Sequence, residues 1–440
     1  MDIKDLKLNT KIIEALVDLG YTEATPIQEK CIPLILEGKD VFGQSSTGSG
    51  KTAAFGLPII EKLRPDNRVQ VLILTPTREL CVQITEALRG FSKYLRLNII
   101  SVYGGVSLEN QIKTIRTADI VVGTPGRILD HIKRGTIKFN SVKHLVLDEA
   151  DRMFDMGFIQ DVEDIIHETP KERQTLLFSA TIPSTVHHII KRHMNNPVNV
   201  KSSTHVDKSL LKQIYFQVKD YEKFSLLISL IKKNPSELTL VFCGTRRMVD
   251  IISRNLNLQG MKTMAIHGGL TQSRRSFALD SLKKENINVL VATDVAARGL
   301  DIKNVNFVYN YDVPKTSDEY IHRIGRTARA GMSGEAITLL SERDYENFSR
   351  VLSDRSLIII KGVTPAFDKV DLVRAFESRS KSSNNFSRGF NRDSRSSSRN
   401  FSRGNDSSRG SRDRSDSNRE HSWGNKSNNR SNRNSGKCNS

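Results

Sequence analysis

Short apolar runs rich in β-branched residues recur along most of this 440-residue chain. Each run is followed by Gly, Thr, Pro or Ser residues and then by a stretch with helical periodicity. The runs are VLIL at 71–74, DIVV at 119–122, HLVL at 144–147, TLLF at 175–178, LTLVF at 238–242, TMAI at 263–266, NVLVA at 288–292 and FVYNY at 307–311. Continuous apolar strands that alternate with helices are typical of a parallel sheet covered on both faces. The pattern therefore predicts an α/β fold with doubly wound parallel sheets.

A polar stretch without periodicity, VKSSTHVDKS at 200–209, interrupts this pattern and resembles a linker. We therefore predict two domains, over 1–203 and 209–366, joined by a linker at 204–208. The segment 378–440 differs from both, because it holds 20 Ser, 12 Asn, 12 Arg and 3 Lys but no Ala, Val, Ile, Leu or Met. Such a segment cannot bury enough apolar surface to offset its ordering entropy, so we predict a disordered basic tail.

Charge and composition narrow the class of protein further. The net charge is +18, and the tail contributes 15 − 5 = +10 of it, which favours a polyanionic partner. The four cysteines are scattered without a CxxC or Cys/His pairing, so neither a disulfide framework nor a zinc site is expected. No apolar run approaches the length of a membrane span, and MDIKDLKLNT at the start lacks the features of a secretory signal. These features indicate a soluble, cytoplasmic protein.

A phosphate-binding loop is predicted directly after an expected strand at 40–43. The segment SSTGSGKT at 45–52 resembles a P-loop, whose glycines let backbone N–H groups surround phosphates at a helix N-terminus. Lys51 would reach the terminal phosphates, and the Thr52 hydroxyl would face Mg²⁺. The alternative is an ordinary Gly/Ser turn. The nucleotide-binding residues predicted here are Ser45, Ser46, Thr47, Gly48, Ser49, Gly50, Lys51 and Thr52.

Two acidic residues, Asp148 and Glu149, follow the apolar run HLVL. A carboxylate at the tip of a buried strand is costly to desolvate unless it meets a cation. Asp148 would hold Mg²⁺, and Glu149 would orient or deprotonate the attacking water. The alternative is a cluster of acids at the N-terminus of a helix, because LDEADRMFD begins a helical pattern.

With Ala150 and Asp151 these acids complete the tetrapeptide DEAD, and the chain resembles the DEAD-box RNA helicases over nearly all of residues 1–340. Further motifs in the family's order are TPIQ at 25–28, PTREL at 76–80, TPGR at 124–127, SAT at 179–181, HGG at 267–269, TDVAARGLD at 293–301 and HRIGRTAR at 322–329. The resemblance implies two tandem RecA-like domains that bind ATP, Mg²⁺ and RNA. It also implies an RNA-stimulated ATPase that unwinds short RNA duplexes or remodels RNA–protein complexes.

The resemblance also implies roles for particular residues. Gln28 and Tyr21 would bind adenine, and Asp301 would contact the ribose. The RNA sugar–phosphate backbone would be held, without sequence preference, by Pro76, Thr77, Arg78, Gly105, Thr124, Gly126, Arg127, Thr245, Gly268, Gln272, Arg275 and Thr293. Gly244 stands where the family often has Asn, which weakens the expectation of an RNA contact there.

The resemblance implies that a third set of residues couples ATP hydrolysis to the separation of RNA strands: Ser179, Thr181, Asp294, Arg298 and His322. Arg326 and Arg329 resemble the family's arginine fingers. Charge that develops on the γ-phosphoryl group needs a cation from outside the P-loop, and the other domain would supply it. The alternative is a helical stripe of solvated arginines.

The tail adds arginines interspersed with Phe386, Phe390, Phe401 and Trp423. Arginine and aromatic side chains pair with phosphates and stack on bases without demanding a sequence, so we expect an RNA tether. An inert solubilising tail is the alternative. For the whole chain, the rival hypotheses are a DNA helicase or translocase and a passive RNA chaperone that works through its tail.

Overall fold

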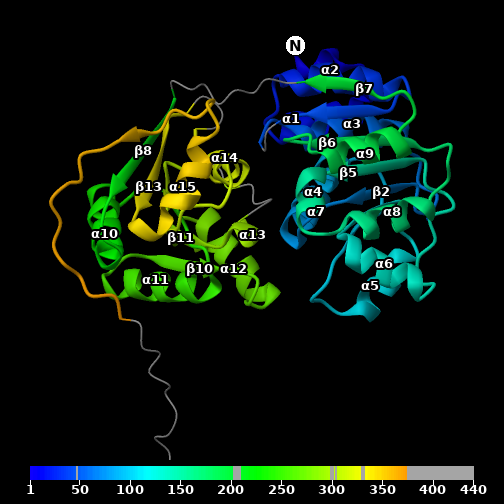
Figure 1. Cartoon of the computed structure of the whole chain (residues 1–440). Coiled ribbons are helices and arrows are strands. Elements are labelled where there is room, and N and C mark those ends of the chain that lie inside the picture. The colour runs from blue at the N-terminus through cyan, green and yellow to red at the C-terminus, as the bar shows by residue number, and fades with distance from the viewer. Residues whose placement is uncertain (46–47, 202–209, 298–301, 303–304, 329–331, 374–440) are drawn as a thin grey trace, which may run out of the picture. The chain divides into compact units, whose positions relative to one another are not determined.

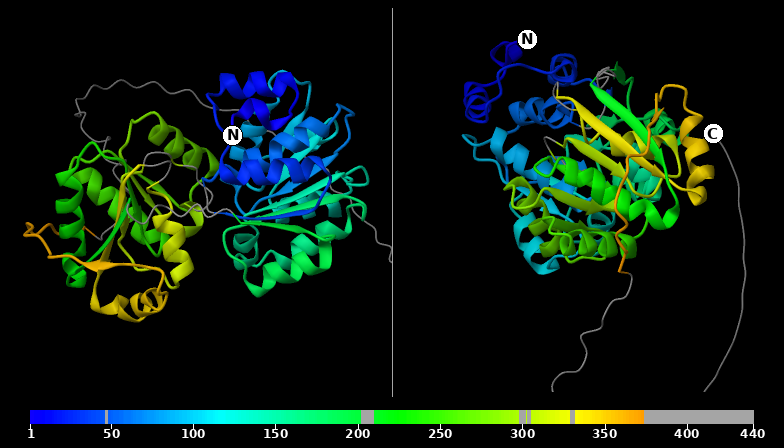
Figure 2. Two further views of the ribbon diagram at one scale, coloured as in Figure 1. Left: turned by 90° about the horizontal axis from the view of Figure 1, so that it is seen from above. Right: turned by 90° about the vertical axis from the view of Figure 1, so that its left-hand side faces the viewer.

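The computed structural model of the chain describes residues 1–45, 48–201, 210–297, 302, 305–328 and 332–373. Within them, two seven-stranded sheets form, and every strand pair in both sheets is parallel. Figures 1 and 2 show helices flanking the strands of each sheet. The predicted α/β class is therefore confirmed. The predicted linker at 204–208 and tail at 378–440 lie outside the described residues.

The first sheet has the strand order β3-β4-β2-β5-β6-β1-β7. Its strands are β1 (Val41–Gln44), β2 (Val71–Leu74), β3 (Ile99–Val102), β4 (Ile120–Gly123), β5 (His144–Asp148), β6 (Gln174–Ser179) and β7 (Val198–Lys201). Its helices are α1 (Thr10–Asp18), α2 (Pro26–Leu36), α3 (Lys51–Lys62), α4 (Arg78–Phe91), α5 (Leu108–Ile115), α6 (Pro125–Lys133), α7 (Ala150–Asp155), α8 (Ile159–His167) and α9 (Ser184–His193), with a 3-10 turn η1 at Ile3–Leu6.

The second sheet has the order β10-β11-β9-β12-β13-β8-β14. Its strands are β8 (Leu211–Gln217), β9 (Thr239–Phe242), β10 (Thr263–Ile266), β11 (Val289–Ala292), β12 (Phe307–Asn310), β13 (Gly334–Leu340) and β14 (Ile360–Lys361). Its helices are α10 (Lys223–Lys233), α11 (Arg246–Leu258), α12 (Gln272–Lys283), α13 (Asp294–Ala297), α14 (Ser317–Ile324) and α15 (Tyr345–Leu352), with 3-10 turns η2 (Asp220–Glu222) and η3 (Glu342–Asp344).

Alternate residues of each central strand enter different apolar cores. In β2, Val71 and Ile73 pack into one core, whereas Leu72 and Leu74 pack into the core on the opposite face. Side chains along a strand point alternately to the two faces of the sheet, so a strand buried on both faces must be apolar throughout. This explains why the apolar runs revealed most of the central strands.

Strands β3, β7, β8, β13 and β14 were not among the expected runs. Polar residues interrupt the apolar pattern in several of them; β8, for example, carries Lys212 and Gln213, and its burial is only partial. Beside β8 lies β14, which has two residues and therefore covers little of it. The predicted strand at 40–43 is shifted by one residue, and the linker-like stretch 200–209 begins inside β7.

After α15 the chain forms an extended strap, residues 357–373, along the second sheet and its helices. The strap contributes β14 and continues to Val373, past the predicted domain boundary at 366. The backbone N–H of Val370 donates to Ser225 Oγ at 3.0 Å, and that hydroxyl donates back to the Val370 carbonyl at 3.2 Å. Asn255 makes a similar reciprocal pair with the backbone of Val373, at 3.0 and 3.1 Å. Three strap residues also pack on an apolar core of the second sheet: Phe367, Val370 and Leu372.

We expect a chain ending at residue 366 to be less stable than one ending at 376. Truncation at 366 removes three partly buried apolar side chains and both reciprocal pairs, which we expect to lower the free energy of unfolding by about 2–4 kcal/mol. Urea unfolding followed by circular dichroism measures the difference. The chain ending at 376 is the control and should unfold at the same urea concentration as the full chain. Equal midpoints for the two truncated chains would rule out a stabilising strap.

Candidate functional site

The loop between β1 and α3 is folded tightly around its own polar groups. Ser45 Oγ lies 2.9 Å from Ser49 Oγ, and Lys51 Nζ donates to the Ser45 carbonyl at 3.2 Å. Gly48 and Gly50 have φ values of 85° and 93°, which are strained for any residue with a side chain. The described part of the loop therefore turns through two glycines with positive φ, and the buried Lys51 ammonium lies against it. Ser46 and Thr47 lie outside the described residues.

Gln28, the expected adenine-binding residue, lies directly against this loop. Its side-chain amide donates to the Gly50 carbonyl at 3.1 Å, and its oxygen accepts the Thr25 N–H at 3.0 Å. Thr25 Oγ1 also donates to the Ser49 carbonyl at 2.8 Å. Gly50 has a φ of 93°, and a Cβ on it would lie 2.4 Å from Gln28 Nε2, so a side chain at this position would be strained and would displace Gln28. Tyr21 is partly buried, with its ring edge-on to Phe91 at 5.9 Å between centroids.

The two predicted acids stand at the carboxyl end of β5, and both are buried. Burial raises the pKa of Asp148 to about 6, while the nearby Lys51 charge opposes this shift and Glu149 adds to it. Such a carboxylate gains from a cation beside it. Glu149 has a φ of 51°, a left-handed conformation that is uncommon for a residue with a side chain. Its backbone N–H donates to Asp148 Oδ1 at 3.0 Å, which helps to fix this turn.

Arg152 is a site residue that sequence reasoning missed. Its guanidinium donates to Glu149 Oε2 at 2.8 Å, and both side chains are almost fully buried. A second guanidinium nitrogen lies 2.7 Å from His322 Nδ1. The signal was the i, i+3 spacing from Glu149 in the helical stretch LDEADRMFD, since residues three apart share a helix face.

The last DEAD residue, Asp151, connects β5 to the predicted coupling segment after β6. Its Oδ2 accepts the Thr181 N–H at 2.8 Å, the Thr181 hydroxyl at 2.9 Å and the Ala180 N–H at 3.2 Å. Ser179 Oγ in turn accepts the Asp151 N–H at 3.3 Å. Burial opposes ionisation of Asp151, but the Thr181 N–H and the charges of His322 and Arg152 outweigh it and lower its pKa.

The RNA-binding residues predicted in the first half follow β2, β3 and β4, which are neighbours in the sheet. Parallel strands end at one edge, so these loops gather there. Arg78 lies against a glycine turn: a Cβ on Gly105 would be 2.2 Å from its Nη1. Arg127 instead donates to Gln111 Oε1 at 3.1 Å and to the Val106 carbonyl at 3.4 Å. Thr77 and Thr124 are the N-cap residues of α4 and α6. Pro76 precedes Thr77, and Gly126 is the second residue of α6.

In the second sheet, Thr245, Gly268 and Thr293 lie at the carboxyl edge, after β9, β10 and β11.

Gln272 and Arg275 contact Glu79, a further residue that sequence reasoning missed. Gln272 Nε2 donates to Glu79 Oε1 at 3.0 Å, and Arg275 Nη2 lies 2.6 Å from Glu79 Oε2. These two polar side chains therefore bind a buried carboxylate.

Arg323 is a further residue that was not predicted. It forms a two-pronged ion pair with Asp294, at 2.5 and 2.7 Å, and donates to Asn310 Oδ1 at 3.0 Å. It therefore holds the predicted coupling residue Asp294 against α14. Arg326, one of the expected fingers, is buried with 1% of its surface exposed. Arg298, Asp301 and Arg329 lie outside the described residues.

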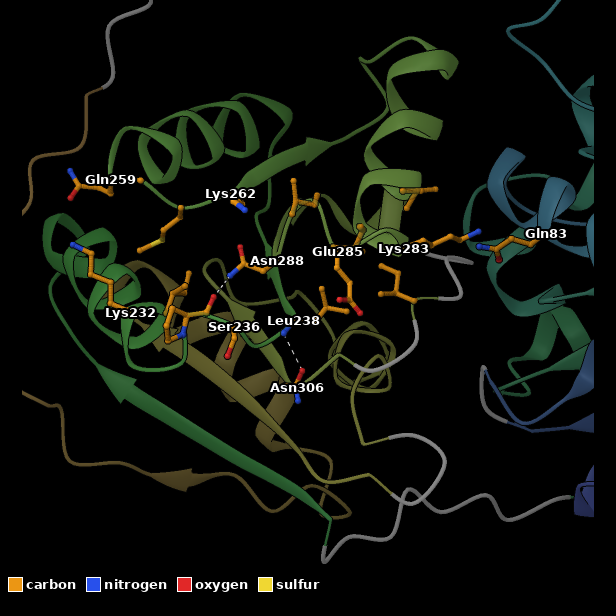
Figure 3. A pocket seen from close by; sticks show the side chains of 18 of the residues that line it. Gln83, Lys232, Ser236, Leu238, Gln259, Lys262, Lys283, Glu285, Asn288 and Asn306 are labelled. Atoms are coloured by element: carbon orange, nitrogen blue, oxygen red, sulfur yellow. Dashed lines mark hydrogen bonds between the residues drawn. The ribbon is translucent and has the colours of Figure 1, made fainter. Parts of the chain in front are cut away.

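A cavity of about 1110 Å³ lies at the opposite, amino edge of the second sheet (Figure 3). Its walls include Leu238 and Met261, and its loops are fixed by hydrogen bonds from Asn288 to the Pro235 carbonyl and from Leu238 N–H to Asn306. The phosphate loop and the DEAD residues belong to the first sheet and to its carboxyl edge. The cavity is therefore separate from the candidate nucleotide site.

The fold and the site together define a P-loop nucleotide hydrolase built from two tandem RecA-like halves. A family model described as DEAD/DEAH box helicase matches residues 25–189, and one described as helicase conserved C-terminal domain matches residues 222–331. The chain belongs to the DEAD-box family of ATP-dependent RNA helicases. It hydrolyses ATP and binds RNA as members of that family do.

Known proteins support this assignment. The chain is 48% identical over 350 residues to the ATP-dependent RNA helicase CshA of Limosilactobacillus reuteri, covering 78% of this chain and 70% of the relative. It is 50% identical over 340 residues to CshA of Listeria monocytogenes, covering 77% and 65%. The structure of Saccharomyces cerevisiae Dbp5 bound to RNA and ADP BeF3 matches with a TM-score of 0.74 and 29% identity, over 82% of this chain and 95% of that one.

Two properties of the described residues bear on metals and membranes. No three His, Cys, Asp or Glu side chains gather in this part of the chain into a metal site of their own. Oxygen donors from Thr52 and Asp148 fit Mg²⁺, which takes few protein ligands and completes its shell with water and phosphate oxygens. Among the described helices, none has the length and apolar character needed to cross a membrane.

Proposed function

We propose that ATP and Mg²⁺ bind between the P-loop and the DEAD residues while RNA lies along the carboxyl edges of both sheets. Binding of both would close the two domains, separate short RNA duplexes or displace bound proteins, and hydrolysis would release the RNA. The observation that carries this proposal is the direct linkage of Asp151 to Thr181. It joins the acids at the end of β5 to the segment after β6 within one hydrogen-bonded network.

Each chemical role rests on a described contact or on the resemblance. Lys51 would bind the terminal phosphates, and Glu149 would take the proton of the attacking water. Arg326 and Arg329 would neutralise charge on the γ-phosphoryl group from the second domain. Thr52 and Asp148 would hold Mg²⁺, which supplies charge neutralisation on the phosphates. Gln28 and Tyr21 would bind adenine, and Asp301 the ribose.

ATP turnover with single-stranded RNA, with DNA of the same sequence, or with neither tests the proposal. We expect stimulation by RNA alone, because a site that recognises the 2′-OH distinguishes RNA from DNA. Equal stimulation by DNA would favour a DNA helicase or translocase instead. Turnover that neither nucleic acid stimulates would favour an RNA chaperone that acts through its tail.

Thr181→Ala should uncouple the two activities. The substitution removes the Thr181 hydroxyl, which donates a hydrogen bond to Asp151 Oδ2 at 2.9 Å. It leaves the P-loop, Asp148 and Glu149 in place. We expect duplex unwinding to fall about tenfold or more while RNA-stimulated ATP turnover falls about threefold or less, given the usual cost of a lost buried hydrogen bond. Strand-displacement and phosphate-release assays give the two rates. Thr114→Ala, on the exposed side of α5, is the control; an equal loss of both activities in Thr181→Ala would exclude a coupling role.

The tail would tether RNA near the two domains, and its net charge of +10 supports that role. Full chain and a chain ending at 376 should then differ in RNA affinity at low salt and converge as salt rises. Identical affinities at low salt would indicate an inert tail. The composition also supports a cytoplasmic location, where such RNA is available.

A further inference from the structure

Glu149 and Arg152 form an ion pair that is almost completely shielded from solvent. Arg152 Nη1 lies 2.8 Å from Glu149 Oε2, and the two side chains expose 2% and 4% of their surface. Taking two charges out of water is costly, and a buried ion pair repays that cost only where hydrogen bonds satisfy the remaining polar atoms. The surroundings of the second carboxylate oxygen therefore show whether this pair serves the fold alone.

That second oxygen, Glu149 Oε1, is left without a protein partner. It accepts no hydrogen bond from any part of the chain that the structure describes. It is also not among the unpaired side-chain atoms that are fully shielded from solvent, so water can reach it. One oxygen of the carboxylate is thus anchored and the other is open, as expected for a group that accepts a proton from water.

The helix that carries Arg152 holds it firmly. Its backbone N–H donates to the Glu149 carbonyl and to Asp151 Oδ1, each at 3.0 Å. Its neighbours Ala150 and Met153 on α7 are fully buried in an apolar core of the first sheet. A guanidinium is planar and its N–H groups point in fixed directions, so a guanidinium fixed in this way can set the orientation of a carboxylate.

We infer that Arg152 positions the Glu149 carboxylate so that Oε1 takes the proton of the attacking water. The water oxygen bonds to the γ-phosphorus as the bond to the β–γ bridging oxygen breaks, and ADP leaves with the bonding electrons. Arg152 touches neither ATP nor this water; it is a positioning residue that acts through Glu149, as a third group orients the base in other active sites. Its role rests on the proposed function, in which Glu149 is the general base.

The kinetic constants of Arg152→Gln test this role in the full chain. We expect kcat to fall about 10- to 100-fold, since a small misplacement of a reacting group can cost about 10²-fold in rate. KM for ATP should stay within about twofold of the native value, because the lost contact is not one with ATP. Arg152→Lys keeps the charge but not the planar fork, so kcat should fall only about 3- to 10-fold. RNA-stimulated phosphate release over a range of ATP concentrations gives both constants.

Combining Arg152→Gln with Glu149→Gln distinguishes positioning from a purely structural role. If Arg152 acts through Glu149, its loss should cost less than about twofold in the Glu149→Gln chain, because residues that act as a unit are not additive. If Arg152→Gln instead disturbs the P-loop or the fold, the two losses should multiply, as independent effects do. Single-turnover hydrolysis of radiolabelled ATP with protein in excess measures the double variant. Multiplied losses would overturn the inference.

Arg173→Gln is the matched control. Arg173 is another partly buried arginine of the first half, and it donates to the Pro170 carbonyl at 2.7 Å. It stands at the amino end of β6, whereas the P-loop follows the carboxyl end of the neighbouring parallel strand β1. We expect its kcat to stay within about twofold of the native value, because it does not affect the geometry of the reacting groups.

Thermal unfolding of each variant checks that the fold is retained. If Arg152→Gln does not fold, Arg152→Lys, alone and combined with Glu149→Gln, provides the same test with the charge kept. A rise in KM for ATP without a loss of kcat in the Arg152 variants would place Arg152 in ATP binding and overturn its positioning role.

Glu149→Gln alone separates failure of the inference from failure of the proposed function. Slow hydrolysis by Glu149→Gln together with native kcat in both Arg152→Gln and Arg152→Lys would reject the role of Arg152 and leave Glu149 as the base. Native hydrolysis by Glu149→Gln would reject the base itself, and the role of Arg152 would fall with it.

Discussion

Replacing Glu149 by Gln should lower the rate of ATP hydrolysis by about 10²- to 10⁴-fold, the usual contribution of a general base. Gln has nearly the same shape and still accepts a hydrogen bond from Arg152, so the left-handed turn at residue 149 should survive. Affinity for ATP and RNA should be retained, because neither depends on proton abstraction. Phosphate release under single-turnover conditions, with RNA dissociation followed in parallel, measures both expectations.

Slow RNA release is the second part of this expected result. If hydrolysis opens the domains, Glu149→Gln should keep RNA bound in the presence of ATP for much longer than the native chain does. Glu163→Gln is the matched control, since Glu163 lies on α8 and pairs with Arg192 at 3.0 Å instead of facing the P-loop. Normal ATP turnover by Glu149→Gln would show that Glu149 is not the general base.

Arg326→Gln should reduce RNA-stimulated hydrolysis by about 10³-fold or more, because an arginine finger contributes about that much to phosphoryl transfer. The effect should fall on kcat, since the charge is needed chiefly in the transition state. Arg326 is buried, so a thermal unfolding curve must accompany the kinetics. Steady-state phosphate release over a range of ATP concentrations separates kcat from KM.

The control for Arg326 is Arg350→Gln on α15, where the side chain is exposed and pairs with Glu346, four residues earlier. It should leave kcat within about twofold of the native value, as expected for an exposed ion pair. If Arg326→Gln raises KM for ATP but leaves kcat unchanged, Arg326 acts in binding ATP and is not an arginine finger.

Much of the fold was predictable because the central strands are buried on both faces. Runs such as HLVL and VLIL must then be apolar throughout, and they coincide closely with β5 and β2. Edge strands carry a weaker signal, so β7 and β14 were missed. The P-loop and the DEAD residues were predictable because their spacing and their place after a strand are local properties of the sequence.

Long-range partners could not be predicted in the same way. Glu79 lies within PTREL, yet its contacts with Gln272 and Arg275 join residues almost 200 positions apart. Arg323 stands beside His322 in a run of basic residues, and only its burial against Asp294 distinguishes it from a solvated side chain. The strap could not be predicted, because its backbone forms hydrogen bonds with Ser225 and Asn255, and no local pattern reveals such partners.

The two sheets share one strand order, since adding seven to each strand number of the first gives the second, and this order shows what the second half lacks. The loop after β8 corresponds to the phosphate loop after β1, but it leads into the short turn η2, which contains Asp220 and Glu222. Two carboxylates at that place repel a triphosphate instead of cradling it. Within the described residues, the first half alone thus carries a phosphate-binding turn after its first strand. The two halves would therefore share a single ATP in each cycle instead of hydrolysing ATP in turn.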